Sequence, residues 1–337
     1  MCNKERPFTY ESTGVSIGRG AAAVDRIKAL ASLTHRAEVT ESIGGFAGGF
    51  QLGDAELLAG ADGVGSKLLI AHALDQLDTI GIDLVAMNVN DVLASGGEPL
   101  FFLDYIAMGR LQAERVQRLV RGIVAGCQVA GCALLGGETA EMPDLYRDGE
   151  FDLSGFAVGR RVFRPLALPR PGDVLVGVAS TGFHSNGYQL IRTVVEHSGH
   201  TWSERFVELD NMTLGEVVLR PTQIYVRAVM ELWGQVAVRA MAHITGGGLI
   251  ENVPRTLAGL GAQIRLNAWP RPAEMQLIQQ WGHIEEVEML HTFNCGIGFT
   301  VVVPEADVQK TQAVLQQHQL KAYAIGRVEE APGVRFR

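Results

Sequence analysis

Glycine is the feature that most limits how this chain can fold: 40 of its 337 residues are glycine, and many lie in clusters beside carboxylates. Glycine weakens helix and strand interiors, so this content predicts many tight turns or places where the backbone closely approaches a ligand. Because the clusters coincide with acidic residues, we favour the second interpretation. The glycine clusters are therefore the first candidates for a functional site.

Charge and hydropathy exclude several classes of protein. The net charge is -8, and Lys and Arg form no cluster with interleaved aromatics, so we expect no nucleic-acid partner. No apolar run approaches the roughly 20 residues that cross a bilayer, and the N-terminus lacks a secretory signal. The four cysteines have neither zinc-site spacing nor the density of a disulfide framework. We expect a cytoplasmic protein with no membrane partner.

The pattern of apolar residues predicts a mixed α and β fold in two domains, a number that 337 residues can accommodate. Pro165, Pro169 and Pro171 place the boundary between 160 and 172, giving domains 1–165 and 172–337. We expect residues 1–20 to form a mobile arm. Expected helices are 24–33, 67–77, 82–94, 113–130, 186–195 and 222–232. Expected strands are 57–61, 100–107, 133–135, 153–158, 174–178, 239–244, 262–266, 298–303 and 322–328.

The segment GADGVGSK (60 to 67) has nearly the glycine spacing of a P-loop, but its last two residues are Ser-Lys instead of Lys-Ser. Asp62 would repel a bare phosphate. A carboxylate there is favourable only through a divalent cation, and Mg²⁺ typically joins one or two carboxylates to phosphate oxygens. Lys67, at a helix start, would then neutralise phosphate charge directly. The alternative is a strand-to-helix turn with a capping aspartate, which this segment alone favours by a modest margin.

Two further segments place polar groups in apolar surroundings. Asn88, Asn90 and Asp91 lie within an expected helix, and buried polar groups need partners. A ligand or metal and a satisfied polar network are equally good interpretations. Glu138 and Glu141 follow the short strand 133–135, where loops often carry function, although either alone could simply be solvated. Together with Asp62 and Asp91 they suit a polyphosphate held through a metal ion.

The second half contains three glycine-rich polar turns. His184, Ser185 and Asn186 precede an expected helix, whose N-terminal amides favour an anion. His184 titrates near neutrality and could move a proton, but a structural histidine is an equally good interpretation. Gly246 to Gly248 are costly to order and mark a close approach of backbone to ligand. The third turn, TFNCGIG (292 to 298), includes Asn294. None of the three is specific by itself.

Taken in order, these segments resemble the phosphoribosylformylglycinamidine cyclo-ligases, also called aminoimidazole ribonucleotide synthetases. The matching stretches run through nearly the whole chain: DGVGSK (62 to 67), GIDLVAMNVNDV (81 to 92), EPLFFLDY (98 to 105), LLGGETAEMP (134 to 143), HSNGY (184 to 188), AHITGGGLIENVPR (242 to 255) and TFNCGIGF (292 to 299). As a set they are highly specific.

The resemblance implies an α+β fold of two domains, with the N-terminal domains pairing into a barrel across a homodimer. It implies ATP and Mg²⁺ near the glycine loop, formylglycinamidine ribonucleotide in the cleft between domains, and closure of the imidazole ring. The residues that it implies for the ATP site are Gly44, Gly45, Gly48, Gly49, Asp62, Gly63, Lys67, Asn90 and Glu138; for the metal, Asp62, Asp91 and Glu138; for catalysis, His184, Asp91 and Lys67; for the substrate, Ser185, Asn186, Thr245, Gly246, Gly247 and Asn294.

The chain departs from the family pattern at Ser16, Arg19, Ser66, Asn88, Gly97, Asp144 and Gln223. Ser16 and Arg19 put the role of the N-terminal arm in doubt, and Gln223 weakens any phosphate role at that position. Relatives in the same superfamily are alternatives. A selenophosphate synthetase needs a reactive Cys near residues 44–50, which hold none, whereas a thiamine-monophosphate kinase leaves phosphate on its product. A catalytically dead nucleotide-binding scaffold is a third alternative.

Overall fold

The computed structural model describes residues 7–337, so the first six residues of the expected arm 1–20 lie outside the described residues. The first half builds a six-stranded sheet in the order β1-β2-β3-β6-β4-β5. All its pairs are antiparallel except β4–β5, which is parallel and is joined by the crossover helix α4 (Ala113–Ala130). Its strands are β1 (Val39–Glu41), β2 (Gly48–Leu52), β3 (Ala55–Gly63), β4 (Gly97–Met108), β5 (Ala133–Glu141) and β6 (Phe151–Arg161).

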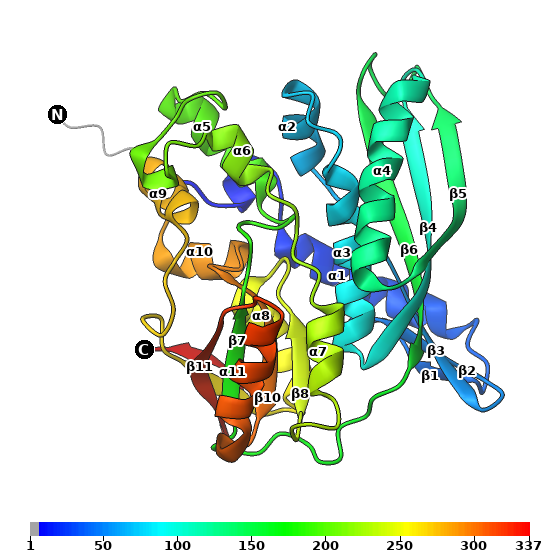
Figure 1. Ribbon diagram of the computed structural model, residues 1–337, viewed down its shortest axis with the longest axis vertical. Coiled ribbons are helices and arrows are strands. Elements are labelled where there is room, and N and C mark those ends of the chain that lie inside the picture. Colours follow the sequence, from blue (N-terminus) through cyan, green and yellow to red (C-terminus); the bar gives the residue numbers. More distant parts are fainter. Residues whose placement is uncertain (1–6) are drawn as a thin grey trace.

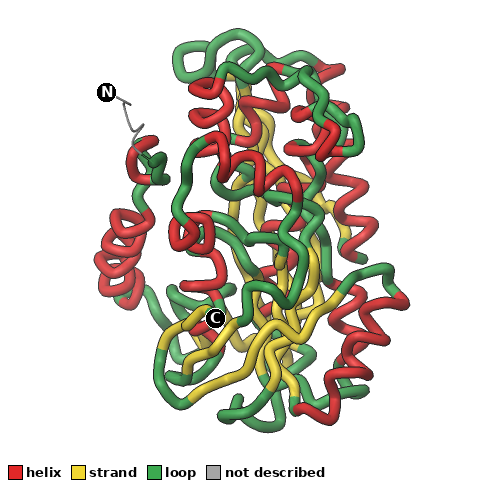
Figure 2. The backbone as a smooth tube through the Cα atoms, turned by 90° about the vertical axis from the view of Figure 1, so that its left-hand side faces the viewer, coloured by secondary structure: helices red, strands yellow, loops and turns green. Residues whose placement is uncertain are grey.

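One face of this sheet is covered by helices α3 (Ile80–Ala94) and α4, and α2 (Lys67–Ala73) lies beside them (Figure 1). Along β6 the burial alternates: Phe151 and Leu153 face the helices and are buried, whereas Phe156 is on the other face and is exposed. Helix α1 (Ile17–Ser32) contains no buried residue and lies at the outside of the molecule near the N-terminus (Figure 2). Within residues 7–337, the first half therefore leaves one sheet face exposed and one helix without a buried side chain.

The second half builds another six-stranded sheet, in the order β12-β9-β11-β7-β10-β8, with only β12–β9 parallel. All seven residues of β10 are buried, as expected of a strand that is covered on both faces. The strands are β7 (Val174–Ala179), β8 (Ala240–His243), β9 (Gly261–Ile264), β10 (Ile297–Val303), β11 (Ala322–Glu329) and β12 (Gly333–Phe336). The helices are α5 (Tyr188–Ser198), α6 (Leu214–Val218), α7 (Val226–Leu232), α8 (Gly248–Asn252), α9 (Ala273–Trp281), α10 (Glu286–Thr292) and α11 (Val308–Gln317).

Helix α3 is the central element of the molecule, because it lies between the first sheet and the second half (Figure 1). Twelve of its fifteen residues are buried, including Asp83, Asn88 and Asn90. A helix that is buried on all sides must find partners for such groups. Those partners define the candidate site described below.

Part of the expected arm is structured. The backbone N–H of Phe8 donates to the Gly282 carbonyl (3.1 Å), and that of Tyr10 donates to Glu288 (2.7 Å). Ser16 caps α1 by accepting from the Arg19 N–H, so this helix begins seven residues earlier than the expected start at 24. That residues 1–20 are mobile in solution stays a prediction.

Candidate functional site

Lys67 does not face an open phosphate site as expected, because it is completely buried. Its Nζ lies 2.8 Å from Asp83 Oδ1 and donates to the carbonyls of His184 (2.9 Å) and Arg220 (2.7 Å). Burial lowers the pKa of Lys67, and the Asp83 charge opposes that shift. With three acceptors already around the ammonium, direct contact with a phosphate would require breaking this arrangement. The geometry instead makes Lys67 a link between α2, α3 and two loops of the second half.

Asp83 is the acceptor at the centre of this link, and the sequence analysis did not identify it. Its Oδ1 accepts from Ser185 Oγ (3.1 Å), from Thr222 N–H (2.8 Å) and from Thr222 Oγ1 (2.5 Å) as well as from Lys67. The available signal was a single carboxylate in the otherwise apolar start of an expected helix. Ser185, expected to bind substrate, is buried with its hydroxyl in this network.

His184 is also beneath the surface, with 1% of it exposed, and not in an open polar turn as expected. Its backbone is left-handed (φ 60°), and its Nε2 accepts from the N–H groups of Thr181 (3.3 Å) and Gln223 (3.5 Å). Burial above all, with the nearby Lys67 charge, lowers the pKa of His184 well below its usual value. His184 is therefore neutral at pH 7, and its burial is the main cause.

The buried, neutral His184 predicts a pH-dependent stability difference. The folded-state pKa of His184 is depressed. Its contribution to the free energy of unfolding is therefore fully present above the unfolded-state pKa near 6.5, and it is lost as pH falls below that value. Wild type should lose about 1.4 kcal/mol of unfolding free energy per pH unit relative to His184→Asn. The stability advantage of wild type should thus shrink between pH 7 and 5, measured by urea unfolding of both proteins. A difference that is constant with pH would contradict a neutral buried His184.

Asp62 and Asp91 lie close enough for their charges to interact, near the junction of the two halves. Burial, reinforced by the Asp91 charge, raises the pKa of Asp62 to about 6. Asp91 is 22% exposed, and His243 Nδ1 lies 2.8 Å from its Oδ1. Two carboxylates whose charges interact, one of them partly open to solvent, offer the oxygen donors that Mg²⁺ uses when phosphates complete its shell. The pair therefore fits a magnesium–nucleotide site.

Glu138 does not join this pair within one chain, contrary to expectation. It lies inside strand β5, which continues to Glu141, because the parallel register with β4 extends past the expected end at 135. Asp62 pairs with Gly155, Gly155 with Asp104, and Asp104 with Gly137, so Glu138 lies about 14 Å away across three strand spacings and points to the opposite face. Among residues 7–337, no three His, Cys, Asp or Glu side chains gather closely enough to hold a metal ion.

Two asparagines expected to bind ligands are occupied by backbone groups. Asn90 Nδ2 donates to the Gln223 carbonyl (2.8 Å), and its Oδ1 accepts from the Tyr225 N–H (3.0 Å). Asn294 Nδ2 donates to the Gly182 carbonyl (2.9 Å), and its Oδ1 accepts from Gly296 N–H (2.8 Å). Both are almost fully buried. Asn90 fastens α3 to the second half, and Asn294 fastens the turn before α5 to the start of β10.

The expected nucleotide loop borders a cavity of about 470 Å³, lined by residues 41–48, 59–61 and His35. Gly44, Gly45 and Gly48 are among its walls, and the β3 wall ends at Ala61, next to Asp62. Gly49 has a packing role, because a Cβ there would lie 2.4 Å from Thr40 Oγ1. A cavity bounded by glycine backbone is compatible with a nucleotide.

The two substrate turns expected in the second half lie side by side. A Cβ on Gly246 would be 3.6 Å from Asn186 Nδ2. The turn after β8 is held by Asn252, whose Nδ2 donates to the carbonyls of Gly246 (3.1 Å) and Gly248 (2.9 Å). Gly247 is left-handed (φ 90°), which explains a glycine at this position. Asn186, Thr245 and Gly246 are only half-buried, so they remain open to a ligand.

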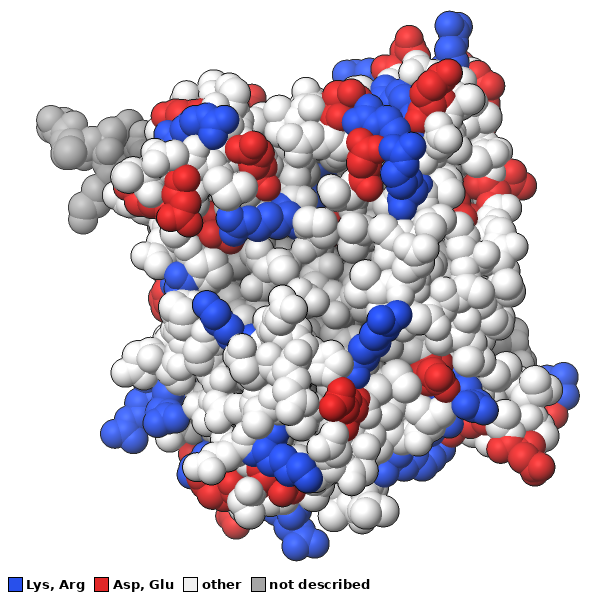
Figure 3. Space-filling view, in the orientation of Figure 1, with Lys and Arg blue, Asp and Glu red and all other residues white. Residues whose placement is uncertain are grey.

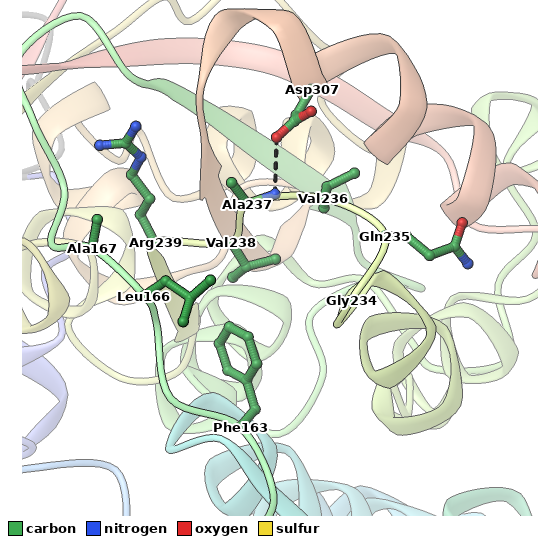
Figure 4. A pocket seen from close by; sticks show the side chains of 10 residues that line it. All are labelled: Phe163, Leu166, Ala167, Gly234, Gln235, Val236, Ala237, Val238, Arg239 and Asp307. Atoms are coloured by element: carbon green, nitrogen blue, oxygen red, sulfur yellow. Dashed lines mark hydrogen bonds between the residues drawn. The ribbon is translucent and has the colours of Figure 1, made fainter.

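A different hollow, of about 360 Å³, lies where the linker passes over residues 234–239, and it contains none of the expected site residues (Figure 4). Its charged groups already have partners: Asp307 accepts from the Ala237 N–H (2.8 Å), and Arg239 pairs with Asp173 (3.4 Å). On the face seen in Figure 3, basic and acidic side chains are interspersed. No helix within residues 7–337 is long and apolar enough to cross a membrane.

Family models match both halves of the chain. Residues 45–161 match the N-terminal domain of AIR synthase related proteins, and residues 170–337 match their C-terminal domain. Thiamine monophosphate kinase from Aquifex aeolicus has a similar structure (TM-score 0.64, 19% identity, 96% of this chain and 98% of that one). So does phosphoribosylformylglycinamidine synthase II from Thermotoga maritima (TM-score 0.61, 17% identity, 89% and 45%). These structures share the α+β fold. Because the two family models together match residues 45–161 and 170–337, the chain is an AIR synthase related protein.

The sequence relatives are more specific. A phosphoribosylformylglycinamidine cyclo-ligase of Desulfitobacterium hafniense is 48% identical over 98% of this chain and 99% of its own length. The trifunctional purine biosynthetic protein adenosine-3 of Bos taurus is 47% identical over 97% of this chain and 34% of its own length. At this similarity over nearly its whole length, the chain belongs to the phosphoribosylformylglycinamidine cyclo-ligase family.

Proposed function

We propose that the chain closes the imidazole ring of formylglycinamidine ribonucleotide with ATP, giving aminoimidazole ribonucleotide, ADP and phosphate, in cytoplasmic purine biosynthesis. The observation that carries this proposal is the 48% identity to a cyclo-ligase over 98% of the chain. The interacting carboxylates of Asp62 and Asp91 and the separate glycine-lined cavity support it. We assign nucleotide binding and dimerisation to domain 1–165, and completion of the substrate cleft to domain 172–337.

The chemistry requires activation of an amide oxygen, which is a poor leaving group. Phosphorylation by ATP converts it into a good one before the amidine nitrogen attacks. Such transfer depends mainly on positioning and charge neutralisation. Mg²⁺, when bound, would supply the positive charge against the phosphates, and Asp62 and Asp91 are the residues that would hold it.

The remaining residues divide by their exposure. The backbone of Gly44, Gly45 and Gly48 would border the nucleotide, and Asn186, Thr245 and Gly246 would contact the ribonucleotide. Lys67, Ser185 and Asn294 would act through the loops that they hold. His184 would move a proton only if its turn opened toward the cleft, because 1% of it is exposed.

A coupled assay tests the function directly. Purified protein with ATP, Mg²⁺ and formylglycinamidine ribonucleotide should form aminoimidazole ribonucleotide and release one phosphate for each ring closed. Omission of ATP is the control. Phosphate retained on the product would favour kinase chemistry, and nucleotide binding without turnover of authentic substrate would favour a scaffold.

We predict that the active form is a homodimer joined mainly by residues before 165. The exposed apolar residues Leu30 (66%), Leu135 (64%) and Phe156 (40%) lie on α1, β5 and the helix-free sheet face. Exposed apolar surface and an unpaired sheet edge favour association, and closed twofold pairing is its commonest form. Light scattering at micromolar concentration should give the mass of a dimer.

Matched variants sharpen this prediction. Leu135→Glu places a charge on the exposed edge strand and should produce monomer, whereas Leu166→Glu, in the exposed linker, should leave the dimer intact. A wild-type protein that is monomeric and fully active would contradict the assignment.

A further inference from the structure

His243 takes part in a chain of hydrogen bonds that joins the two halves of the molecule. It ends strand β8 and is completely buried. Its Nδ1 lies 2.8 Å from Asp91 Oδ1, and its Nε2 lies 3.5 Å from Asn90 Nδ2. Both partners belong to α3 in the first half. One ring of the second half thus contacts two consecutive residues of the central helix.

The hydrogen-bond partners of His243 determine which of its ring nitrogens carries the proton. Asn90 Oδ1 accepts from the Tyr225 N–H and its Nδ2 donates to the Gln223 carbonyl, so the Asn90 amide orientation is set by backbone groups. The second Nδ2 hydrogen then faces His243 Nε2, which must accept. The ring therefore carries its proton on Nδ1 and donates it to the Asp91 carboxylate.

The hydrogen bond from His243 determines how the Asp91 carboxylate is oriented. The carboxylate is 22% exposed and one of its oxygens is engaged by His243, which leaves the other free to bind. No other hydrogen bond to the Asp91 side chain is formed within residues 7–337. Without the imidazole, the carboxylate would be free to adopt other rotamers. Partners of this kind orient ligating carboxylates in metal sites.

We propose that His243 is a positioning residue that holds the Asp91 carboxylate in the orientation required for the divalent cation of the Mg²⁺–nucleotide complex. The inference rests on the proposed function, because it concerns the same cation. It also couples the site to domain arrangement, since Asp91 is aligned only when β8 packs against α3. His243 acts through Asp91 and touches no reacting group in this scheme.

The test measures how nucleotide binding depends on Mg²⁺. A non-hydrolysable ATP analogue is titrated into wild type, His243→Leu and His243→Asn by calorimetry at several Mg²⁺ concentrations. Leu fills similar space without polar atoms, whereas the Asn side-chain amide retains a donor at the Nδ1 position. We expect His243→Leu to raise the half-saturating Mg²⁺ concentration roughly 10- to 100-fold, and His243→Asn to recover most of that loss.

Met241→Ala is the matched control for a purely structural effect. Met241 lies on the same strand, is buried, and has no N–H or O–H group in its side chain to donate to Asp91. This variant should lower the melting temperature but leave the Mg²⁺ dependence unchanged. An equal shift in Met241→Ala, or no shift in a folded His243→Leu, would overturn the positioning role.

Two further outcomes separate this inference from the proposed function. If wild type binds the nucleotide analogue without any need for Mg²⁺, both fail; if it needs Mg²⁺ and His243→Leu behaves the same, only the positioning role fails. Should the Leu variant not fold, nitrogen NMR of histidine-labelled wild type still decides. A proton found on Nε2 of His243 instead of Nδ1 would overturn the proposal.

Discussion

Replacing Asp91 with asparagine is expected to almost abolish turnover while leaving the fold intact. The substitution removes one full negative charge from a site for a divalent cation, whose electrostatic contribution is worth several kcal/mol. At about 1.36 kcal/mol per factor of ten, the loss in turnover should be roughly a thousandfold or more. Asn retains an oxygen that can accept from His243 Nδ1, now 2.8 Å from the carboxylate. Steady-state turnover should therefore fall sharply in this variant, whereas its thermal unfolding should change little.

Asp54→Asn is the control for the loss of one charge, because Asp54 lies in the exposed turn between β2 and β3. It should retain wild-type activity. Raising Mg²⁺ should recover part of the activity of Asp91→Asn if its defect is weaker cation binding. Full activity of Asp91→Asn at ordinary Mg²⁺ would show that the cation is held elsewhere.

Local sequence patterns predicted the helices and strands whose sequence signal lies entirely within their own residues. The helix expected at 113–130 is observed over the same residues, because its apolar residues repeat at helical spacing and Gly131, left-handed, ends it. The strand expected at 133–135 is too short. Its extension to Glu141 depends on parallel pairing with β4, and the glycines and glutamates of that stretch carry no strand signal of their own.

The candidate site, too, contains residues whose roles could be predicted from the sequence and residues whose roles could not. Asp62 and Asp91 could be singled out, since carboxylates beside glycine turns and in an apolar helix are unusual. The roles of Lys67 and Asn90 could not be predicted, because they donate to the carbonyl groups of Arg220 and Gln223, more than 130 residues away in the chain. A backbone carbonyl has no sequence signature. Residues identified as ligand-binding by their polarity thus include several that instead join the two halves.

One departure from the family pattern has a physical reason that the sequence could not indicate. The family resemblance implies alanine at position 97, where this chain has Gly97. A Cβ there would lie 2.7 Å from Val92 Cγ1 and 2.8 Å from Leu58 Cδ1, both in the core. Val92 or Leu58 would have to shift to accept the methyl group, so the glycine matches the packing of this particular chain.

Lys67→Met is expected to destabilise the protein by about 3–5 kcal/mol, the usual cost of breaking a buried ion pair. The physical reason is that the Asp83 carboxylate, fully buried, would lose the cation with which it pairs, Lys67. Urea unfolding measures the loss. A direct phosphate role for Lys67 predicts the opposite pattern, in which stability is nearly unchanged and nucleotide affinity falls. The experiment therefore decides between the role expected from the sequence and the one that the geometry favours.

The double variant Lys67→Met, Asp83→Asn identifies the cause of any instability. Asn at 83 removes the uncompensated charge but keeps an oxygen for Thr222 and Ser185, which donate to Asp83 Oδ1 in wild type. If the penalty comes from an unpaired buried charge, the double variant should be more stable than Lys67→Met alone. If it is no more stable, the loss comes from the two carbonyls of His184 and Arg220 that Lys67 no longer satisfies. In that case the lysine would act mainly as a hydrogen-bond donor that holds the two loops, and its charge would matter little.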